Sequence, residues 1–183
     1  AADVSAKVEN QTLRLTAKQE FRISIDQQGL AEGQFRLTPL PGFATTINGQ
    51  VTAVILDGIG KDIRVEADAA CEVQVFDAFV PRDLRVAGDG RTVVFCGRMT
   101  VGRDLRVSAD QGGGVLFMDG AEVRRDLRVD LDDGATDVVL LDFQIGDDAL
   151  IQPGEAPRGT ASTVLLDAGV VLDRLTIECT SGD

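Results

Sequence analysis

Short apolar runs separated by turn residues dominate the chain beyond residue 50. One pattern joins an Asp, an aliphatic residue, an Arg and a Val, and it recurs every 21 or 22 residues. Its copies are Asp62–Val65, Asp83–Val86, Asp104–Val107 and Asp126–Val129, with weaker copies at residues 148–151 and 173–177. Recurrence at a fixed interval predicts a repeat protein, in which each unit packs on its neighbours.

A second series of apolar runs lies between these copies, and each run is closed by Asp or Gly. The runs are Ala53–Leu56, Val73–Phe76, Val93–Cys96, Val115–Met118, Val138–Leu141 and Thr163–Leu166. Val, Ile, Leu and Phe dominate them, which favours strands over helices. A further apolar position in each repeat indicates a short third strand, at Val80, Val101, Val123 and Ile145.

A unit of this length is too short for a strand, a crossover helix and a second strand, which need about 30 residues. We therefore predict an all-β fold, a single-stranded parallel β-helix (β-solenoid) whose coils advance by roughly 4.8 Å and pair with their neighbours. Crossovers between parallel strands favour a right-handed coil. About six coils are expected over residues 51–183.

Residues 1–50 also alternate between apolar and polar positions, but they lack the Asp and Arg pattern. Alternation of this kind is typical of strands with one wet face. We predict that residues 1–50 form a strand-rich cap or an inter-subunit pairing segment at one end of the solenoid. Residues 1–20 are expected to be contributed in part across a head-to-tail interface between subunits.

Composition argues against several functional classes. Thirty acidic residues against 18 basic ones give a formal charge of −12, which disfavours a nucleic-acid surface. His, Trp and Tyr are absent, so the commonest general base, the commonest zinc ligand and most stacking platforms are missing. No apolar run approaches the 18 residues of a membrane-spanning helix.

The cysteines and the first residues bear on the compartment. Cys71, Cys96 and Cys179 are too few for a disulfide framework, and at most one internal bridge can form. The start Ala1-Ala2-Asp3 matches what cleavage after a small-residue site leaves. We therefore expect a secreted chain, extracellular or at the cell surface, whose signal peptide has been removed.

Stacking the repeat places equivalent charged residues above one another. One column holds Arg64, Arg85, Arg106 and Arg128, and the other holds Asp62, Asp83, Asp104 and Asp126. Residues two apart on a strand share a face, so we predict that both columns point outward. Two interpretations stay open, namely a self-neutralising surface and a surface that pairs with a similar rod or with an anionic glycan.

Alternate positions of a strand face opposite sides of the sheet, and the apolar runs have apolar residues at both sets of positions. One apolar set must therefore face outward. We predict that the outward set is the one that shares a side with Gln74. Its members are Leu56, Phe76, Cys96, Met118, Leu141 and Leu166. A sheet that is apolar on both faces is normally covered on both, here either by residues 1–50 or by another subunit.

Four stretches resemble secreted bacterial β-solenoid repeat proteins. They are Asn10–Thr16, Phe21–Asp26, Val54–Val65 with its Asp-Gly-Ile-Gly-Lys-Asp ending, and Asp130–Leu140. The resemblance is to the extracellular repeats of planctomycete-type bacteria and, more remotely, to the calcium repeats of haemolysin-type proteins. It implies an extracellular structural role and raises calcium as a ligand.

A third column is the candidate calcium site. It consists of Asp68, Asp89, Asp110 and Asp132, each six residues after the Asp of its repeat. Stacked carboxylates suit calcium, whereas Asp beside Gly also caps its own turn. In haemolysin-type repeats the apolar residue falls two positions after the Asp, but here Leu84 and Leu105 fall one after it. Turn capping is therefore favoured, with no cofactor required.

We predict from these patterns an extracellular structural subunit, without a catalytic site, whose partner is another copy of itself. It would assemble head to tail into a filament or surface layer. A cell-surface adhesion or glycan-binding module is the alternative, because the charged columns would suit it. A β-helix polysaccharide lyase is the third possibility, which the identical charges on every repeat disfavour because a catalytic cleft breaks the pattern.

Overall fold

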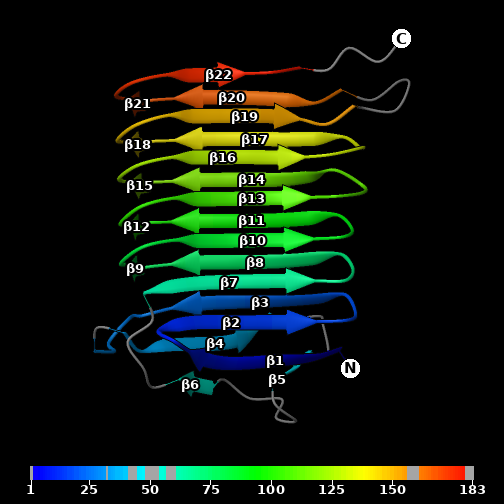
Figure 1. The fold of residues 1–183 in the computed structure, drawn as a ribbon, viewed down its shortest axis with the longest axis vertical. Helices are drawn as coiled ribbons and strands as arrows, with labels where there is room; N and C mark the ends of the chain where they lie inside the picture. The colour runs from blue at the N-terminus through cyan, green and yellow to red at the C-terminus, as the bar shows by residue number, and fades with distance from the viewer. Residues whose placement is uncertain are drawn as a thin grey trace.

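A computed structural model describes residues 2–31, 33–40, 45–47, 54–56, 61–155 and 161–179. These residues form strands and turns, with no helix among them. The strands stack in register into a rod, a parallel β-solenoid whose successive coils are 21 or 22 residues apart over most of its length (Figure 1). The predicted fold class is confirmed.

The first face of the rod, sheet A, contains one strand from each coil, and these strands run parallel. They are β2 (Thr12–Ala17), β7 (Asp62–Ala67), β10 (Leu84–Gly88), β13 (Leu105–Ala109), β16 (Leu127–Leu131), β19 (Ala149–Pro153) and β22 (Leu175–Ile177). Inward and outward side chains alternate along each, so the outward Arg of one coil lies over the Arg of the next.

The other two faces follow in each coil. Sheet B contains β3 (Phe21–Asp26), β8 (Cys71–Phe76), β11 (Thr92–Gly97), β14 (Gly114–Asp119), β17 (Thr136–Leu141) and β20 (Thr163–Asp167). Sheet C contains the predicted short strands, β9 (Phe79–Val80), β12 (Thr100–Val101), β15 (Glu122–Val123), β18 (Gln144–Ile145) and β21 (Val170–Val171). Together they make five complete coils, β7–β9 to β19–β21.

The boundary expected at residue 50 differs from the observed one. Strands β2 and β3 pair in parallel with β7 and β8, so Thr12–Asp26 is the first, incomplete coil of the solenoid. The cap consists of β1 (Ala2–Glu9), β4 (Phe35–Pro39), β5 (Thr45–Ile47) and β6 (Val54–Leu56). Strand β6, which we assigned to the solenoid, pairs antiparallel with β4.

Residues 1–20 are engaged within their own chain. Strand β1 pairs antiparallel with β2 on one side and parallel with β5 on the other. Its Val4 and Ala6 are buried in the core. This contradicts the expectation that the segment is donated across a subunit interface, because both edges of β1 already have partners.

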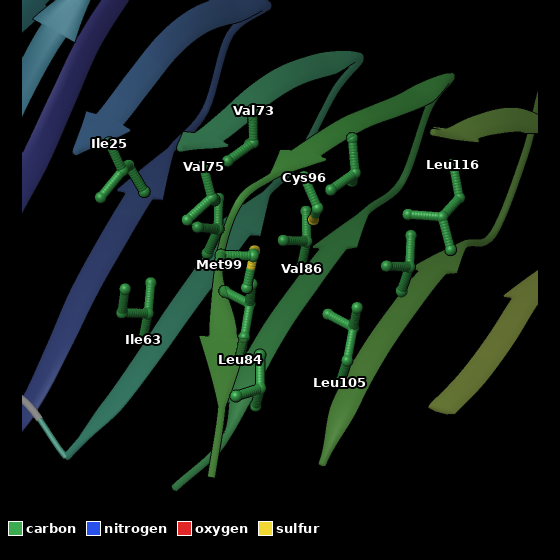
Figure 2. Close-up of a cluster of buried hydrophobic side chains, with 14 of the residues drawn as sticks. Ile25, Ile63, Val73, Val75, Leu84, Val86, Cys96, Met99, Leu105 and Leu116 are labelled. Atoms are coloured by element: carbon green, nitrogen blue, oxygen red, sulfur yellow. The ribbon is translucent and has the colours of Figure 1, made fainter. Parts of the chain in front are cut away.

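The interior is a set of apolar columns that run along the rod. Figure 2 shows inward side chains of sheets A and B meeting between the faces, among them Leu84, Leu105 and Leu116. These three side chains are inaccessible to solvent. The polar exceptions Thr92 and Thr136 donate hydrogen bonds from their hydroxyls to the carbonyls of Gly90 and Gly134, at 3.2 and 3.4 Å. The core is therefore continuous from the cap to the last coil.

The predicted outward apolar set is wrong at several positions. Cys96 pairs with Val75 and Met118, not with Phe76, so Cys96 and Met118 point inward and are buried (Figure 2 labels Cys96). Leu166 lies over Leu140 and faces inward too. A one-residue slip in register exchanges the two faces of a strand, and that slip separates the prediction from the structure.

Two members of the predicted set, Phe76 and Leu141, do lie on the outward face of sheet B, and the side chain of Leu56 lies outside the described residues. The outward apolar series is instead Phe95, Phe117, Val139 and Leu165, in register on successive strands. The rings of Phe95 and Phe117 lie 6.1 Å apart at 49°. Phe95, Phe117 and Val139 are each partly buried, while Leu165 is 49% exposed.

Equivalent leucines in one column test how burial depends on position along the rod. Leu105 is inaccessible in the middle of the rod, whereas Leu175 in β22 is 43% exposed. We expect Leu105→Ala to lower the free energy of unfolding by about 2–5 kcal/mol. Leu175→Ala should lower it by about 1 kcal/mol or less, because the side chain is already half in water. Chemical denaturation measures both, and equal costs would contradict the column assignment.

Candidate functional site

The outward face of sheet A carries a ladder of arginines. Backbone pairing places them in register on adjacent strands, and they are Arg14, Arg64, Arg85, Arg106 and Arg128. We call this set the Arg ladder. Its first member was missed because Thr12 replaces the expected Asp, although Leu-Arg-Leu at residues 13–15 matches the rest of the pattern. Adjacent members are separated by roughly 4.8 Å of strand spacing.

A second cation column, which the repeat analysis overlooked, lies at the corner before sheet A. It consists of Lys61, Arg82, Arg103 and Arg125, whose backbones stack through N–H to carbonyl hydrogen bonds of 2.8 to 3.0 Å. We call it the corner column. The signal was available, since each member directly precedes an Asp of the repeat. The column changes sign in the last coils, where Asp147 and Asp173 take the equivalent places.

The Asp column was predicted to point outward beside the arginines, and the structure corrects this in part. The side chain of Asp104 is only 5% exposed and that of Asp62 is 16% exposed, whereas Asp83 is 40% exposed. Asp62 is the first residue of β7, and Asp83, Asp104 and Asp126 each directly precede a strand of sheet A. They lie at a corner of the coil, where strand alternation does not set the direction of a side chain. Their carboxylates turn toward the next coil.

The carboxylates of Asp62, Asp83 and Asp126 each accept a backbone N–H from the next coil, whereas the buried Oδ1 of Asp104 has no hydrogen-bond partner among the described residues. The Asp83 N–H donates to Asp62 Oδ1 at 3.2 Å, and the Asp104 N–H donates to Asp83 Oδ1 at 3.4 Å. The same carboxylates bind the corner column of the following coil. Arg82 binds Asp62 through both its Nε and Nη2 atoms, and Arg103 Nε lies 3.6 Å from Asp83 Oδ1. The Asp column therefore stabilises the stacking of coils.

The environment of Asp62 favours its charged form. Burial acts to raise the pKa of this carboxyl, but hydrogen bonds from Arg82 and from the Asp83 N–H outweigh it. The pKa of Asp62 is consequently held below its ordinary value. The guanidinium of Arg82 is in turn held in its charged state, since its pKa is raised by the same contact.

The Arg ladder is only partly neutralised. Arg14 and Arg64 share one carboxylate, that of Glu66, with Arg64 Nε at 2.6 Å and Arg14 Nη1 at 3.2 Å. Arg106 lies 3.2 Å from Asp104, and Arg128 lies 3.4 Å from Asp130. Arg85, in the middle of the ladder, forms no side-chain hydrogen bond or ion pair within the described residues.

Two shallow hollows flank the ladder along sheet A. One, of about 270 Å³, is lined by Arg14, Arg64, Arg85 and Arg106 together with Thr12, Asp62, Asp83 and Asp104. The other, of about 330 Å³, is lined by Arg85, Arg106 and Arg128 with Ser108, Asp110 and Asp130. Arg85 and Arg106 belong to both hollows, which lie on opposite sides of the ladder, the first beside the Asp column and the second beside Ser108 and Asp130.

The candidate calcium column does not gather into a site. Asp68, Asp89, Asp110 and Asp132 are exposed at the turn between sheets A and B, each in the same place of its coil. No three of these carboxylates place their oxygens within 4.8 Å of one another. The Asp132 carboxylate accepts a hydrogen bond of 3.1 Å from the N–H of the following residue, Asp133. Asp68 also lines a hollow of about 560 Å³ with Asp3, Lys18 and Glu66.

One other acidic group lies near the C-terminal end of the described chain. Asp147, Asp148 and Asp173 place one carboxylate oxygen each within 4.8 Å of the others. Such a group has the oxygen ligands that a hard cation prefers. Surface carboxylates also gather without an ion, so we assign no metal to this group.

The last coil is exposed to solvent at its end. We define the open end as strands β20, β21 and β22, which are the terminal strands of sheets B, C and A. Its exposed apolar side chains are Leu165 at 49%, Val170 at 51%, Leu172 at 63%, Leu175 at 43% and Ile177 at 41%. Phe143, Leu166, Val171 and Leu175 border a hollow of about 430 Å³ there. Of the exposed side chains, Leu175 and Ile177 continue inward columns of sheet A, which therefore reach the surface at this end.

The cysteines do not form a bridge within the chain. Cys71 and Cys96 are buried and Cys179 is exposed, and all three are free thiols. Burial raises the pKa of Cys71 to about 11 and that of Cys96 to about 12. Both buried thiols are therefore protonated at neutral pH and inert as nucleophiles.

The described residues contain no helix that is long and apolar enough to cross a membrane. Comparison of the chain with protein-family models, with curated proteins and with solved structures finds no match in any of the three.

The Asp62 contact predicts a pH dependence. A carboxyl whose pKa is lower in the folded state stabilises the fold above its unfolded pKa, and this contribution is lost as the pH falls through the folded value. Asp62→Asn should lower the free energy of unfolding by about 1 kcal/mol at pH 7 and by less below pH 4. Asp110→Asn, at an exposed turn, is the control. Denaturation at several pH values measures both, and identical pH profiles would refute the role of Asp62.

Thiol reactivity checks the corrected direction of Cys96. At pH 8 the native protein should react with Ellman's reagent at Cys179 alone, because the other two thiols are buried and protonated. Unfolding in guanidinium chloride should expose all three. Rapid reaction of a second thiol in the native protein would place Cys96 or Cys71 on an accessible face.

Proposed function

We propose that this chain is a structural subunit that assembles head to tail through its open end into a filament or layer. The observation that carries the proposal is the exposure of the inward apolar columns at β22. Leu175 and Ile177 occupy the same columns as Leu105 and Val107, which are buried, yet they are 43% and 41% exposed.

The energetics of the open end favour covering it. Full burial of a large aliphatic side chain contributes about 1.5–3 kcal/mol. Because each of these side chains is about half exposed, covering it would contribute roughly half of that amount. The outer edges of β20 and β22 also lack a paired strand within the described residues. Unpaired N–H and C=O groups on a strand edge are a template for another chain. A second subunit that supplies strands would satisfy both requirements.

Charge favours a head-to-tail over a tail-to-tail contact. Residues 132–183 contain eleven of the 30 acidic residues but only two of the 18 basic ones. Two open ends brought together would place these like charges opposite each other, which is unfavourable. The described N-terminal strands carry a more balanced set, with Lys7, Arg14, Arg22 and Arg36 among their acidic residues.

The opposite end of the rod offers matching edges. Strand β5 is the last strand of sheet A and β6 is the last of sheet B, so the two sheets that end at β22 and β20 also end there. Figure 1 places these strands at the far end of the rod from β22. Contact between β22 and β5, and between β20 and β6, would continue both sheets from one subunit into the next. A contact of this heterologous kind does not close and so propagates.

The experiment compares two lysine substitutions on neighbouring positions of β22. Ile177→Lys places a charge on the inward apolar column of the open end, whereas Thr176→Lys places it on the outward face. We expect the unsubstituted protein and Thr176→Lys to gain mass with concentration in multi-angle light scattering. Ile177→Lys should remain a monomer, because a buried unpaired charge is costly.

Melting temperatures of all three proteins guard against a folding defect, which is expected to be small because Ile177 is already 41% exposed. A monomer at every concentration for the unsubstituted protein would refute the proposal. So would equal loss of association in both variants, since the inward column would then have no special part in the contact.

A further inference from the structure

We propose that the Arg ladder binds one chain of a linear polysaccharide that carries carboxylate groups. This goes beyond the assembly proposal, since the ladder lies along the side of the rod and not at its ends. A ligand on sheet A would remain accessible in a head-to-tail filament. The argument rests on charge, shape and the flanking polar groups.

The first step concerns charge. Two cation columns, the Arg ladder and the corner column, share one Asp column between them. Asp62 and Asp83 are bound by Arg82 and Arg103 of the corner column. Asp104 faces Arg106 at 3.2 Å and Arg125 at 3.9 Å. Asp62 and Asp83 are thus occupied by the corner column, whereas Asp104 lies nearer to the ladder.

Arg85 shows the consequence most clearly. It is exposed, and the residue two positions after it is Ala87, where Arg64 and Arg128 have Glu66 and Asp130. The equivalent residue after Arg106 is Ser108. The guanidinium of Arg85 is therefore available to a ligand, whereas that of Arg106 has a carboxylate only on the side of Asp104.

The second step concerns shape. The ladder spans five adjacent strands, on the order of 20 Å from Arg14 to Arg128. One hollow lies on each side of it, and Arg85 and Arg106 line both. Acidic residues border the track on both sides, with the Asp column on one and Glu66, Asp110 and Asp130 on the other. A single row of arginines with a hollow on each side suits one extended chain that lies along the row.

The third step concerns chemistry. Guanidinium groups bind carboxylates through paired hydrogen bonds, and the ladder places one guanidinium group on each strand. The bordering carboxylates and the hydroxyls of Thr12 and Ser108 accept hydrogen bonds. Sugar hydroxyls donate such bonds, so a sugar acid satisfies both kinds of group. The bases of a DNA strand bind best where they can stack on aromatic side chains, and neither hollow is lined by one.

The overall negative charge does not prevent this contact at physiological salt. The acidic Asp147 and Asp148 precede β19, three strands from β10, which is on the order of 14 Å. The screening length at 0.15 M salt is about 8 Å. Repulsion from that end is therefore damped, whereas direct contacts to Arg85 and Arg106 are not.

The experiment measures fluorescence anisotropy of labelled oligogalacturonate at 0.15 M salt with increasing protein. Arg85→Gln and Arg91→Gln are a matched pair, because both residues belong to the same coil and are exposed, and Arg91 lies in a turn outside the track. We expect Arg85→Gln to weaken binding by roughly threefold or more, and Arg85→Gln with Arg106→Gln by roughly tenfold. Arg91→Gln should change binding by less than about twofold.

Neutral dextran, poly-glutamate and oligo(dT) are the competitor probes, and none should displace oligogalacturonate at equal concentration of residues. The measurement is repeated in the Ile177→Lys background, so that loss of assembly and loss of binding are separated. No binding of oligogalacturonate overturns the proposal, and so does an equal effect of Arg85→Gln and Arg91→Gln. Displacement by poly-glutamate or oligo(dT) also overturns it, since the ladder would then recognise any polyanion.

Discussion

In-register stacking of parallel strands is the constraint on which the rest of this molecule depends. Each side chain has its own equivalents in the coils above and below as nearest neighbours. Side-chain volumes must therefore be matched along the rod, as at the corner where Ala78, Met99, Ala121 and Phe143 alternate small and large. A Cβ on the next member, Gly169, would lie 1.9 Å from the Phe143 ring, so a larger residue there would require that ring to move.

The same constraint makes surface charge a structural problem. A charged residue repeated in every coil faces its own kind at the strand spacing, where like charges repel. The fold answers with an Asp column that accepts backbone N–H groups from the next coil and binds the corner arginines. The Asp column thereby becomes part of the stacking itself. Asp62 and Asp83 are engaged at the corner, and Arg85 of the outward ladder is left without a carboxylate partner among the described residues.

A stack of coils also has two ends that differ. At one end the antiparallel strands β1 and β4 fold back over the first coil, and Val4, Phe35 and Ile47 are buried beneath them. At the other, the apolar columns emerge at β22 still half exposed. The ends and the side of the rod thus present different chemistry, apolar edges at one end and alternating charge along sheet A. The proposed assembly uses the first and the proposed glycan contact uses the second.

The sequence by itself determined the β-solenoid, its repeat length, the three strands of each coil and the outward Arg column, because an almost identical tetrapeptide recurs in register. Only the tertiary structure decided which side chains of sheet B face inward. Phe76 pairs with Gly97 and not with Cys96, and this shift of one residue exchanges the inward and outward faces of β11 relative to the prediction. It also decided the burial of Asp104, which lies at a corner where strand alternation has no force. The first coil at Thr12–Asp26 was hidden because the cap strands separate it from the second coil, and long-range pairing leaves no local signal.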